Sequence, residues 1–383
     1  MTRLPVFLLG LLATAPLAMA ASAADAVRSG AYHQHGTTQG RPACDQRRSR
    51  ASTQPAARPL RSLQQTHTVD LPWRQETDLE IGEYRDEAHL DGDATGLATG
   101  EHSYKYRMLE GLVVPPYVTP ARLNLSRTIA TQPADVCHCS FPKSGSTWLA
   151  NILYLVLHDG HEPGQGAPLR SHLHWMESAW TYPRTREQVD ALPSPRIFKS
   201  HMPHHMALAG GPRQSPCRFI YIARNPKDVC VSYYHFESGS AWSGGYDGTW
   251  EHWLRLFMDG RVQRGDWLDH VLSWWEVRGE ENMLFLRYED LKRDFRGQLA
   301  RIAAHVGVQL SPKAVDRVVA ASSFSHMRAA PFSNHKHIAD FQGFFRKGEV
   351  GSWRDRFTVA QTDAFDRLYT ERMADSGLTF TFE

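Results

Sequence analysis

The sequence has little cysteine and almost no excess of charge. Its 5 cysteines are scattered through 383 residues and have neither the spacing of a zinc site nor the pattern of a disulfide framework. The formal net charge of +2 argues against a protein that coats a polyanion, so no nucleic-acid partner is expected and any anion site must be a local cluster. The hydrophobic content of 42% is ordinary for a globular protein and sufficient for a sizeable core, in one large α/β domain with extensions or in two domains.

Residues 1–102 lack the periodic apolar pattern of a packed domain. Residues 1–24 hold Arg3, the apolar run Pro5–Ala20 and small residues that suit signal peptidase, which predicts a signal peptide or a short signal anchor. The alternative is a misassigned start codon. Residues 25–102 are mostly polar, so they are predicted to be a disordered extension that cannot bury enough apolar surface to offset chain entropy.

The folded domain is predicted to span residues 103–383. Its first part, Tyr104–Thr131, contains several prolines and predicts irregular chain leading into the first strand. Short apolar runs separated by helical stretches follow, and this alternation predicts an α/β domain with a central parallel sheet and helices on both faces.

Four of the predicted strands lead directly into polar residues. Ligands of parallel sheets bind beyond the carboxyl ends of the strands, so a single shared site is expected there. The four pairs of strand and polar residue are Asp135–Ser140 with Lys143, Arg196–Phe198 with Lys199 and His201, Arg218–Ala223 with Arg224, and Met283–Arg287 with Tyr288.

The loop that precedes the apolar helical run Leu149–Leu157 has the features of an anion site. Gly145 lets backbone approach a ligand closely, and Ser146 and Thr147 can cap the helix and donate hydroxyl groups. Lys143 adds a full positive charge but precedes the glycine, whereas the usual nucleotide-triphosphate loop places lysine after its second glycine. The alternative interpretation of this loop alone is a serine-rich helix cap with a surface lysine.

Two later stretches of the chain are Arg224–Phe236 and Arg346–Trp353. Together with the loop, and in the same order along the chain, they resemble the signatures of the cytosolic-type sulfotransferases, which use 3'-phosphoadenosine 5'-phosphosulfate (PAPS). The resemblance runs from about Tyr104 to the C-terminus. It implies a P-loop-like three-layer fold and transfer of a sulfuryl group from PAPS to a hydroxyl or amine of a small acceptor, with release of 3'-phosphoadenosine 5'-phosphate (PAP) and without a metal ion.

The resemblance also implies a donor site. Arg224 and Ser232 would bind the 3'-phosphate, and Arg346 and Lys347 would add charge to it. The aromatic residues of the set would line the adenine pocket, although ordinary core is the commoner role of such residues. The complete set is Lys143, Ser144, Gly145, Ser146, Thr147, Trp148, Arg224, Ser232, Tyr288, Ser322, Phe324, Arg346, Lys347 and Gly348.

The candidate catalytic residues are His201, Lys143, Lys199 and Ser232. Lys199 and His201 are two steps apart on an extended chain, so their side chains are expected on the same face. His201 would take the proton of the acceptor hydroxyl, Lys143 would neutralise the leaving phosphate, and Lys199 would stabilise the sulfonyl oxygens. Ser232 would hold Lys143 away until the acceptor arrives, as the resemblance implies.

Residues 172–182 and 237–250 are predicted to line the site and are rich in aromatic residues and histidine. The acceptor is therefore expected to be a small molecule such as a phenol or another apolar alcohol. Residues Arg354–Asp363 resemble the family's dimer motif and predict a homodimer. The alternative functions are a non-catalytic PAP-binding protein of the same fold and a P-loop kinase. The family is largely cytosolic, but a functional leader would direct the chain into the secretory pathway.

Overall fold

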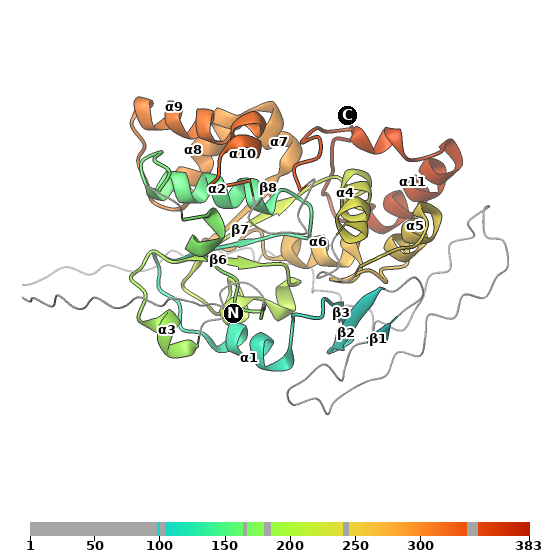
Figure 1. Cartoon of the computed structure of the whole chain (residues 1–383), viewed down its shortest axis with the longest axis horizontal. Coiled ribbons are helices and arrows are strands. Elements are labelled where there is room, and N and C mark those ends of the chain that lie inside the picture. The colour runs from blue at the N-terminus through green and yellow to red at the C-terminus, as the bar shows by residue number, and fades with distance from the viewer. Residues whose placement is uncertain (1–97, 100–103, 164–166, 180–184, 240–244, 335–343) are drawn as a thin grey trace, which may run out of the picture. The chain divides into compact units, whose positions relative to one another are not determined.

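The computed structural model describes residues 98–99, 104–163, 167–179, 185–239, 245–334 and 344–383 (Figure 1). The predicted leader, and the predicted extension apart from residues 98–99, lie outside this part of the chain. No helix within the described ranges is both long and apolar enough to cross a membrane.

A five-stranded sheet in the order β5-β6-β4-β7-β8 forms the centre of the domain. All its neighbouring strands are parallel, and in the register Cys139 of β4 lies opposite Ser200 of β6 and Tyr221 of β7. The predicted parallel sheet is therefore confirmed. Its strands are β4 Val136–Cys139, β5 Leu173–His174, β6 Ile197–Ser200, β7 Arg218–Ala223 and β8 Met283–Arg287.

Helices cover both faces of this sheet. Alternate residues of β7 belong to different hydrophobic clusters: Phe219 and Tyr221 pack in one, and Ile220 and Ile222 pack in the other. The first cluster includes residues of α4 Pro226–Ser238, α5 Trp250–Met258, α6 Trp267–Glu276 and α11 Val359–Met373. The second includes residues of α2 Ser146–Leu157, α8 Phe295–His305 and α9 Pro312–Ala321. In Figure 1 the two groups of helices lie on either side of the strands, which gives the expected three layers.

The other helices of the described ranges are α1 Pro120–Thr128, α3 Arg186–Asp190, α7 Tyr288–Arg293 and α10 Phe324–Ala329.

The prediction of irregular chain for residues 104–131 is wrong. The strands β2 Lys105–Leu109 and β3 Leu112–Val114 form an antiparallel hairpin, to which β1 Ala98–Thr99 adds a third strand. The helix α1 follows, with Thr119 as its N-cap and Pro120 in its first turn. Proline is favoured in the first turn because the amide hydrogen that it lacks would have no helical partner there, so this proline starts a helix instead of breaking one.

Candidate functional site

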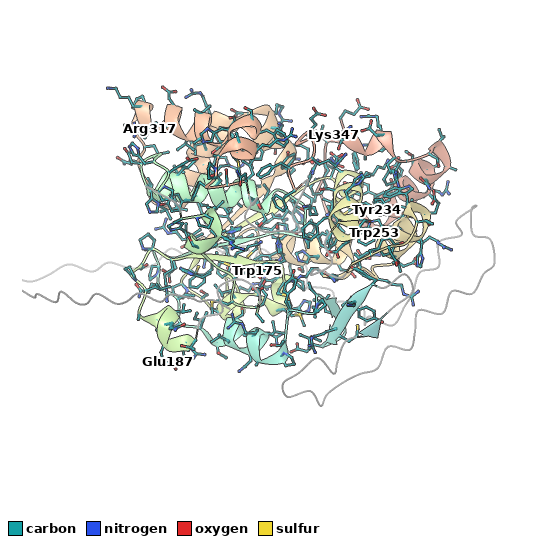
Figure 2. All side chains as sticks on the ribbon, in the orientation of Figure 1. Trp175, Glu187, Tyr234, Trp253, Arg317 and Lys347 are labelled. Carbon is teal, nitrogen blue, oxygen red and sulfur yellow. The ribbon has the colours of Figure 1, made fainter. Side chains whose placement is uncertain are left out.

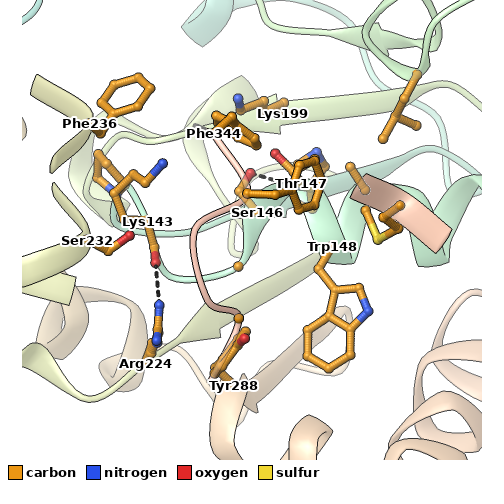
Figure 3. Close-up of a pocket in the computed structure, with 18 of the residues that line it drawn as sticks. Lys143, Ser146, Thr147, Trp148, Lys199, Arg224, Ser232, Phe236, Tyr288 and Phe344 are labelled. Carbon is orange, nitrogen blue, oxygen red and sulfur yellow. Dashed lines mark hydrogen bonds between the residues drawn. The ribbon is translucent and has the colours of Figure 1, made fainter. Parts of the chain in front are cut away.

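A cavity of about 660 Å³ lies at the carboxyl edge of the parallel sheet. Every residue predicted for the site lines it except Ser144, and Figure 3 shows part of this lining. Ser144 is fully buried, and its hydroxyl has no hydrogen-bond partner among the described residues. The four strand-end groups predicted to share a site, Lys143, His201, Arg224 and Tyr288, therefore meet in one cavity.

The turn into α2 is made by glycine rather than by a hydroxyl cap. Gly145 is the N-cap with φ 105°, and no side chain caps the helix, so the predicted capping by Ser146 or Thr147 is wrong. A Cβ on Gly145 would lie 2.9 Å from the ring of Tyr288. The hydroxyl of Ser146 instead lies 3.5 Å from Nδ1 of His138. The cavity thus retains the first-turn amides of α2 as an anion-binding feature.

Two half-buried lysines of the site rest on aromatic faces rather than on carboxylates. Nζ of Lys143 lies 4.2 Å from the ring centre of Phe236 and 4.4 Å from that of Phe344. Nζ of Lys199 lies 4.0 Å from the ring centre of Trp175. Burial lowers the pKa of Lys143 to about 7 and that of Lys199 to about 8. An aromatic face holds a cation without neutralising it, so both ammonium groups can serve an anionic ligand.

Arg224 is fixed between the first loop and the C-terminal loop. Its Nη1 donates to the carbonyl of Lys143 over 3.5 Å (Figure 3), and its Nη2 donates to the carbonyl of Glu349 over 2.7 Å. The guanidinium also pairs with Asp228 at 3.3 Å. Its Nε is buried and has no hydrogen-bond partner among the described residues. Because the bonds of Nη1 and Nη2 fix the guanidinium, this remaining donor is held ready for a ligand.

Asp228 links α4 to the loop that carries Arg346 and Lys347. Its carboxylate accepts hydrogen bonds from the amides of Gly351 and Trp353, each over 2.9 Å. Asp228 is not among the site residues predicted from the sequence. Its position in the first turn of α4, close to Arg224, is visible in the sequence. Its hydrogen-bond partners in the loop are more than a hundred residues away, so no nearby sequence pattern predicts these bonds.

An aromatic slot lies beside these cations. Trp148 donates its indole hydrogen to the carbonyl of Ser322 over 2.9 Å, and its ring centre lies 5.4 Å from that of Tyr288. Gly348, with φ 68°, passes so close to Phe324 that a Cβ would lie 2.4 Å from the ring. Such a slot beside cationic groups and helix amides fits a planar base attached to phosphates.

His201 is held in one tautomer by the backbone. Its Nδ1 lies 2.8 Å from the carbonyl oxygen of Ser140. A carbonyl oxygen can only accept, so Nδ1 carries the hydrogen and Nε2 retains the lone pair. The amide of His201 donates to Glu177 over 2.9 Å, and its carbonyl accepts from His270 over 3.0 Å.

The imidazole of His201 is in the neutral form. Burial, with the nearby charges of Lys199 and Arg264, lowers the pKa of His201 well below its ordinary value. His204 and His205, which the sequence placed close by, are not among the residues that line the cavity. A neutral imidazole with its free nitrogen at a cavity can accept a proton from a hydroxyl group.

The rest of the lining is largely aromatic, and the sequence located it only in part. Tyr117, Trp175 and Tyr233 line the cavity together with Phe236. None of the described residues of the segment 237–250, predicted to line the site, does so. Its rings are in the core instead, because Tyr246 and Trp250 pack in the cluster of α4 and α5. Within the described ranges no three His, Cys, Asp or Glu side chains form a group that could hold a metal ion.

Comparisons with known proteins agree with this geometry. The family model of the sulfotransferase domain matches residues 133–377. Sulfotransferase 1C2 of Rattus norvegicus is 37% identical over 267 residues, which cover 67% of this chain and 89% of the relative. Sulfotransferase 1B1 of Mus musculus is 37% identical over 276 residues, which cover 69% and 92%. The crystal structure of a mouse sulfotransferase complexed with PAP superposes with a TM-score of 0.60 at 29% identity, covering 71% of this chain and 95% of that one.

Proposed function

This chain belongs to the sulfotransferase family, and from that membership we propose how its own residues carry out the transfer and which acceptors they favour. The enzyme transfers a sulfuryl group from PAPS to an acceptor and releases PAP.

The donor would lie along the cationic and aromatic parts of the cavity. The unpartnered Nε of Arg224, with Ser232, Arg346 and Lys347, would hold the 3'-phosphate. The slot of Trp148 would hold the adenine, and the amides that follow Gly145 would hold the 5'-phosphate. PAPS supplies the activated sulfuryl group.

His201 is proposed as the general base. Its Nδ1 is tied to a carbonyl, which leaves Nε2 to take the proton of the acceptor hydroxyl, and this arrangement is the observation that carries the proposal. Lys143 would offset the charge that develops on the leaving phosphate, and Lys199 would stabilise the sulfonyl oxygens. Ser232 would restrain Lys143 until the acceptor is bound.

The test replaces His201 by alanine. H201A is expected to lose about 10²–10⁴ in turnover, the usual contribution of a general base, while PAP affinity stays near that of the wild type. H205A is the matched control, because it removes a neighbouring imidazole that does not line the cavity. Turnover of H201A within a few-fold of the wild type would contradict the assignment.

The acceptor is proposed to be a small phenol or a similar alcohol. The rings of Tyr117, Trp175, Tyr233 and Phe236 line the cavity that His201 reaches. Flat aromatic walls of this kind favour a planar acceptor, whose ring gains stacking and apolar contact while its hydroxyl reaches the imidazole.

A homodimer through Arg354–Asp363 is also proposed. Val359, in the first turn of α11, is 78% exposed and is the large hydrophobic side chain that stands out from the described surface. An apolar side chain in the middle of a motif that resembles a dimer contact is suited to meet its own copy across a twofold axis.

A further inference from the structure

Arg264 is a buried guanidinium in the wall of the cavity. It lies between α5 and α6, and only 1% of its surface is exposed. Its backbone has φ 76°, a left-handed conformation that is uncommon for a residue with a side chain, and its amide donates to the carbonyl of Val113 over 2.7 Å. The backbone is therefore held so that this side chain points inward among the residues of the cavity.

The charge of Arg264 is poorly compensated. Nη1 donates to Sδ of Met202 over 2.8 Å, and a thioether is a weak and uncharged acceptor. The guanidinium also forms a hydrogen bond with the side chain of Tyr117, whose hydroxyl is likewise uncharged because burial raises its pKa. Nη2 is buried and has no hydrogen-bond partner among the described residues, and no ion pair within those ranges includes Arg264. Buried cations normally have a carboxylate partner, so a guanidinium of this kind indicates an anion that arrives with a ligand.

The position of this guanidinium places it beside the reacting groups. Its partner Met202 directly follows His201 in the chain. Its charge also contributes to lowering the pKa of both His201 and Lys199. The two buried acids nearby have other contacts, since Glu177 accepts from the amide of His201 and Glu237 lies close enough to Lys143 to favour its charged form.

We infer that the preferred acceptor carries a carboxylate, which the Arg264 guanidinium binds while the acceptor hydroxyl lies at Nε2 of His201. This inference rests on the proposed function and narrows its acceptor class to small hydroxy acids with an aromatic spacer. The two-pronged geometry of the guanidinium matches the two oxygens of a carboxylate, and the aromatic lining matches the spacer.

The carboxylate takes no part in the bond changes. The hydroxyl oxygen forms a bond to sulfur, the bond from sulfur to the phosphate oxygen breaks, its electron pair leaves with PAP, and the hydroxyl proton passes to His201. The carboxylate acts through charge. It offsets the positive field of Arg264 that weakens the imidazole as a base, so a bound hydroxy acid also makes His201 more basic.

The test compares two phenols that differ only in charge, para-hydroxyphenylpropionate and para-hydroxyphenylpropionamide. For the wild type, kcat/KM is expected to favour the carboxylate by about 10-fold or more, the effect of one charge-assisted contact. In R264Q this ratio is expected to fall to about one. R296Q is the matched control, because it removes an exposed arginine of α8, and it should keep the wild-type ratio.

Titration of each phenol onto the enzyme–PAP complex gives a second readout that does not need turnover. Tighter binding of the carboxylate by the wild type, lost in R264Q, supports the inference. Equal binding of the two phenols by the wild type, or a ratio kept in R264Q, overturns it. If R264Q fails to fold, as shown by loss of PAP binding, the wild-type isotherms alone decide. Failure of the wild type to sulfate either phenol contradicts the phenol acceptor class, whereas equal turnover of both contradicts only the role of Arg264.

Discussion

Single residues at this site acquire their chemistry from where they are buried. In the sequence Lys143 and Lys199 are two ordinary lysines, but burial in the folded chain lowers their pKa values to about 7 and about 8. Aromatic faces stabilise their cationic forms only in part. Without a ligand, these two lysines therefore carry less positive charge near neutral pH than the sequence suggests. A bound phosphate would favour their charged forms.

PAP binding is expected to take up a proton. Above a pH of about 7 Lys143 begins to lose its proton in the free enzyme, whereas the bound phosphate favours the ammonium form. PAP affinity should therefore fall as the pH rises through this range, by up to about 10-fold per pH unit for one proton. Calorimetric titrations in buffers of different ionisation enthalpy measure the uptake.

The matched variant for this experiment is K143R. Its guanidinium stays charged throughout the range, so the pH dependence that Lys143 contributes should disappear. An affinity of the wild type that is constant from pH 6.5 to about 9 would contradict a titrating lysine at the phosphate site.

At the scale of secondary-structure elements, the contact between α4 and the C-terminal loop holds the loop in place. Asp228, in the first turn of α4, accepts from the amides of Gly351 and Trp353 and from the hydroxyl of Ser352. These bonds place the loop of Arg346 beside Arg224, so a single buried carboxylate joins the two cationic parts of the proposed 3'-phosphate site.

D228N is expected to loosen this loop. Its amide nitrogen would face hydrogen-bond donors, so PAP should bind about 1.5–3 kcal/mol more weakly, the scale of a lost charge-assisted bond. The preference for PAP over AMP should shrink, because that preference depends on the 3'-phosphate. Binding isotherms for both nucleotides measure it.

D316N provides the control for this element, because it removes an exposed acid of α9 that pairs with Arg296. Thermal denaturation of D228N separates a local effect from unfolding. An unchanged ratio of PAP to AMP affinity in folded D228N would show that the loop does not depend on this carboxylate.

At the scale of the whole molecule, the proposed dimer contact lies at the surface, in the first turn of α11. Val359 is 78% exposed, and Arg354 of the same segment forms an ion pair with Glu383. Charged side chains such as those of Glu187 and Arg317 lie at the edge of the molecule (Figure 2). Burial of one valine contributes about 1.5–3 kcal/mol, which is enough to shift a weak twofold association measurably.

V359E is expected to shift the enzyme from dimer to monomer, because a carboxylate would meet its own copy across the axis. Sedimentation equilibrium over a range of protein concentrations measures the change. A300E, at an exposed position of α8, should leave the association unchanged. A wild type that sediments as a monomer at every concentration would contradict the proposed dimer.

Local patterns predicted much of the fold and part of the site. The bounds of β7 and β8 coincide with the apolar runs, and Pro226 begins α4 as expected. Such features depend on neighbouring residues, so the sequence displays them directly. The cap of α2 by Gly145 was missed because a serine in the first turn resembles a cap equally well.

The sequence by itself determined the family, the order of the strands and loops, and the residues that the parallel sheet brings to one edge. Only the tertiary structure decided which charges are paired there. Asp228 meets its loop across 125 residues, and Arg264 meets Met202 across 62 residues. Pairing between residues so far apart depends on how the sheet and helices pack, and no pattern among neighbouring residues encodes it. For this reason the guanidinium of Arg264, which has no ion pair within the described ranges, became visible only in the folded chain.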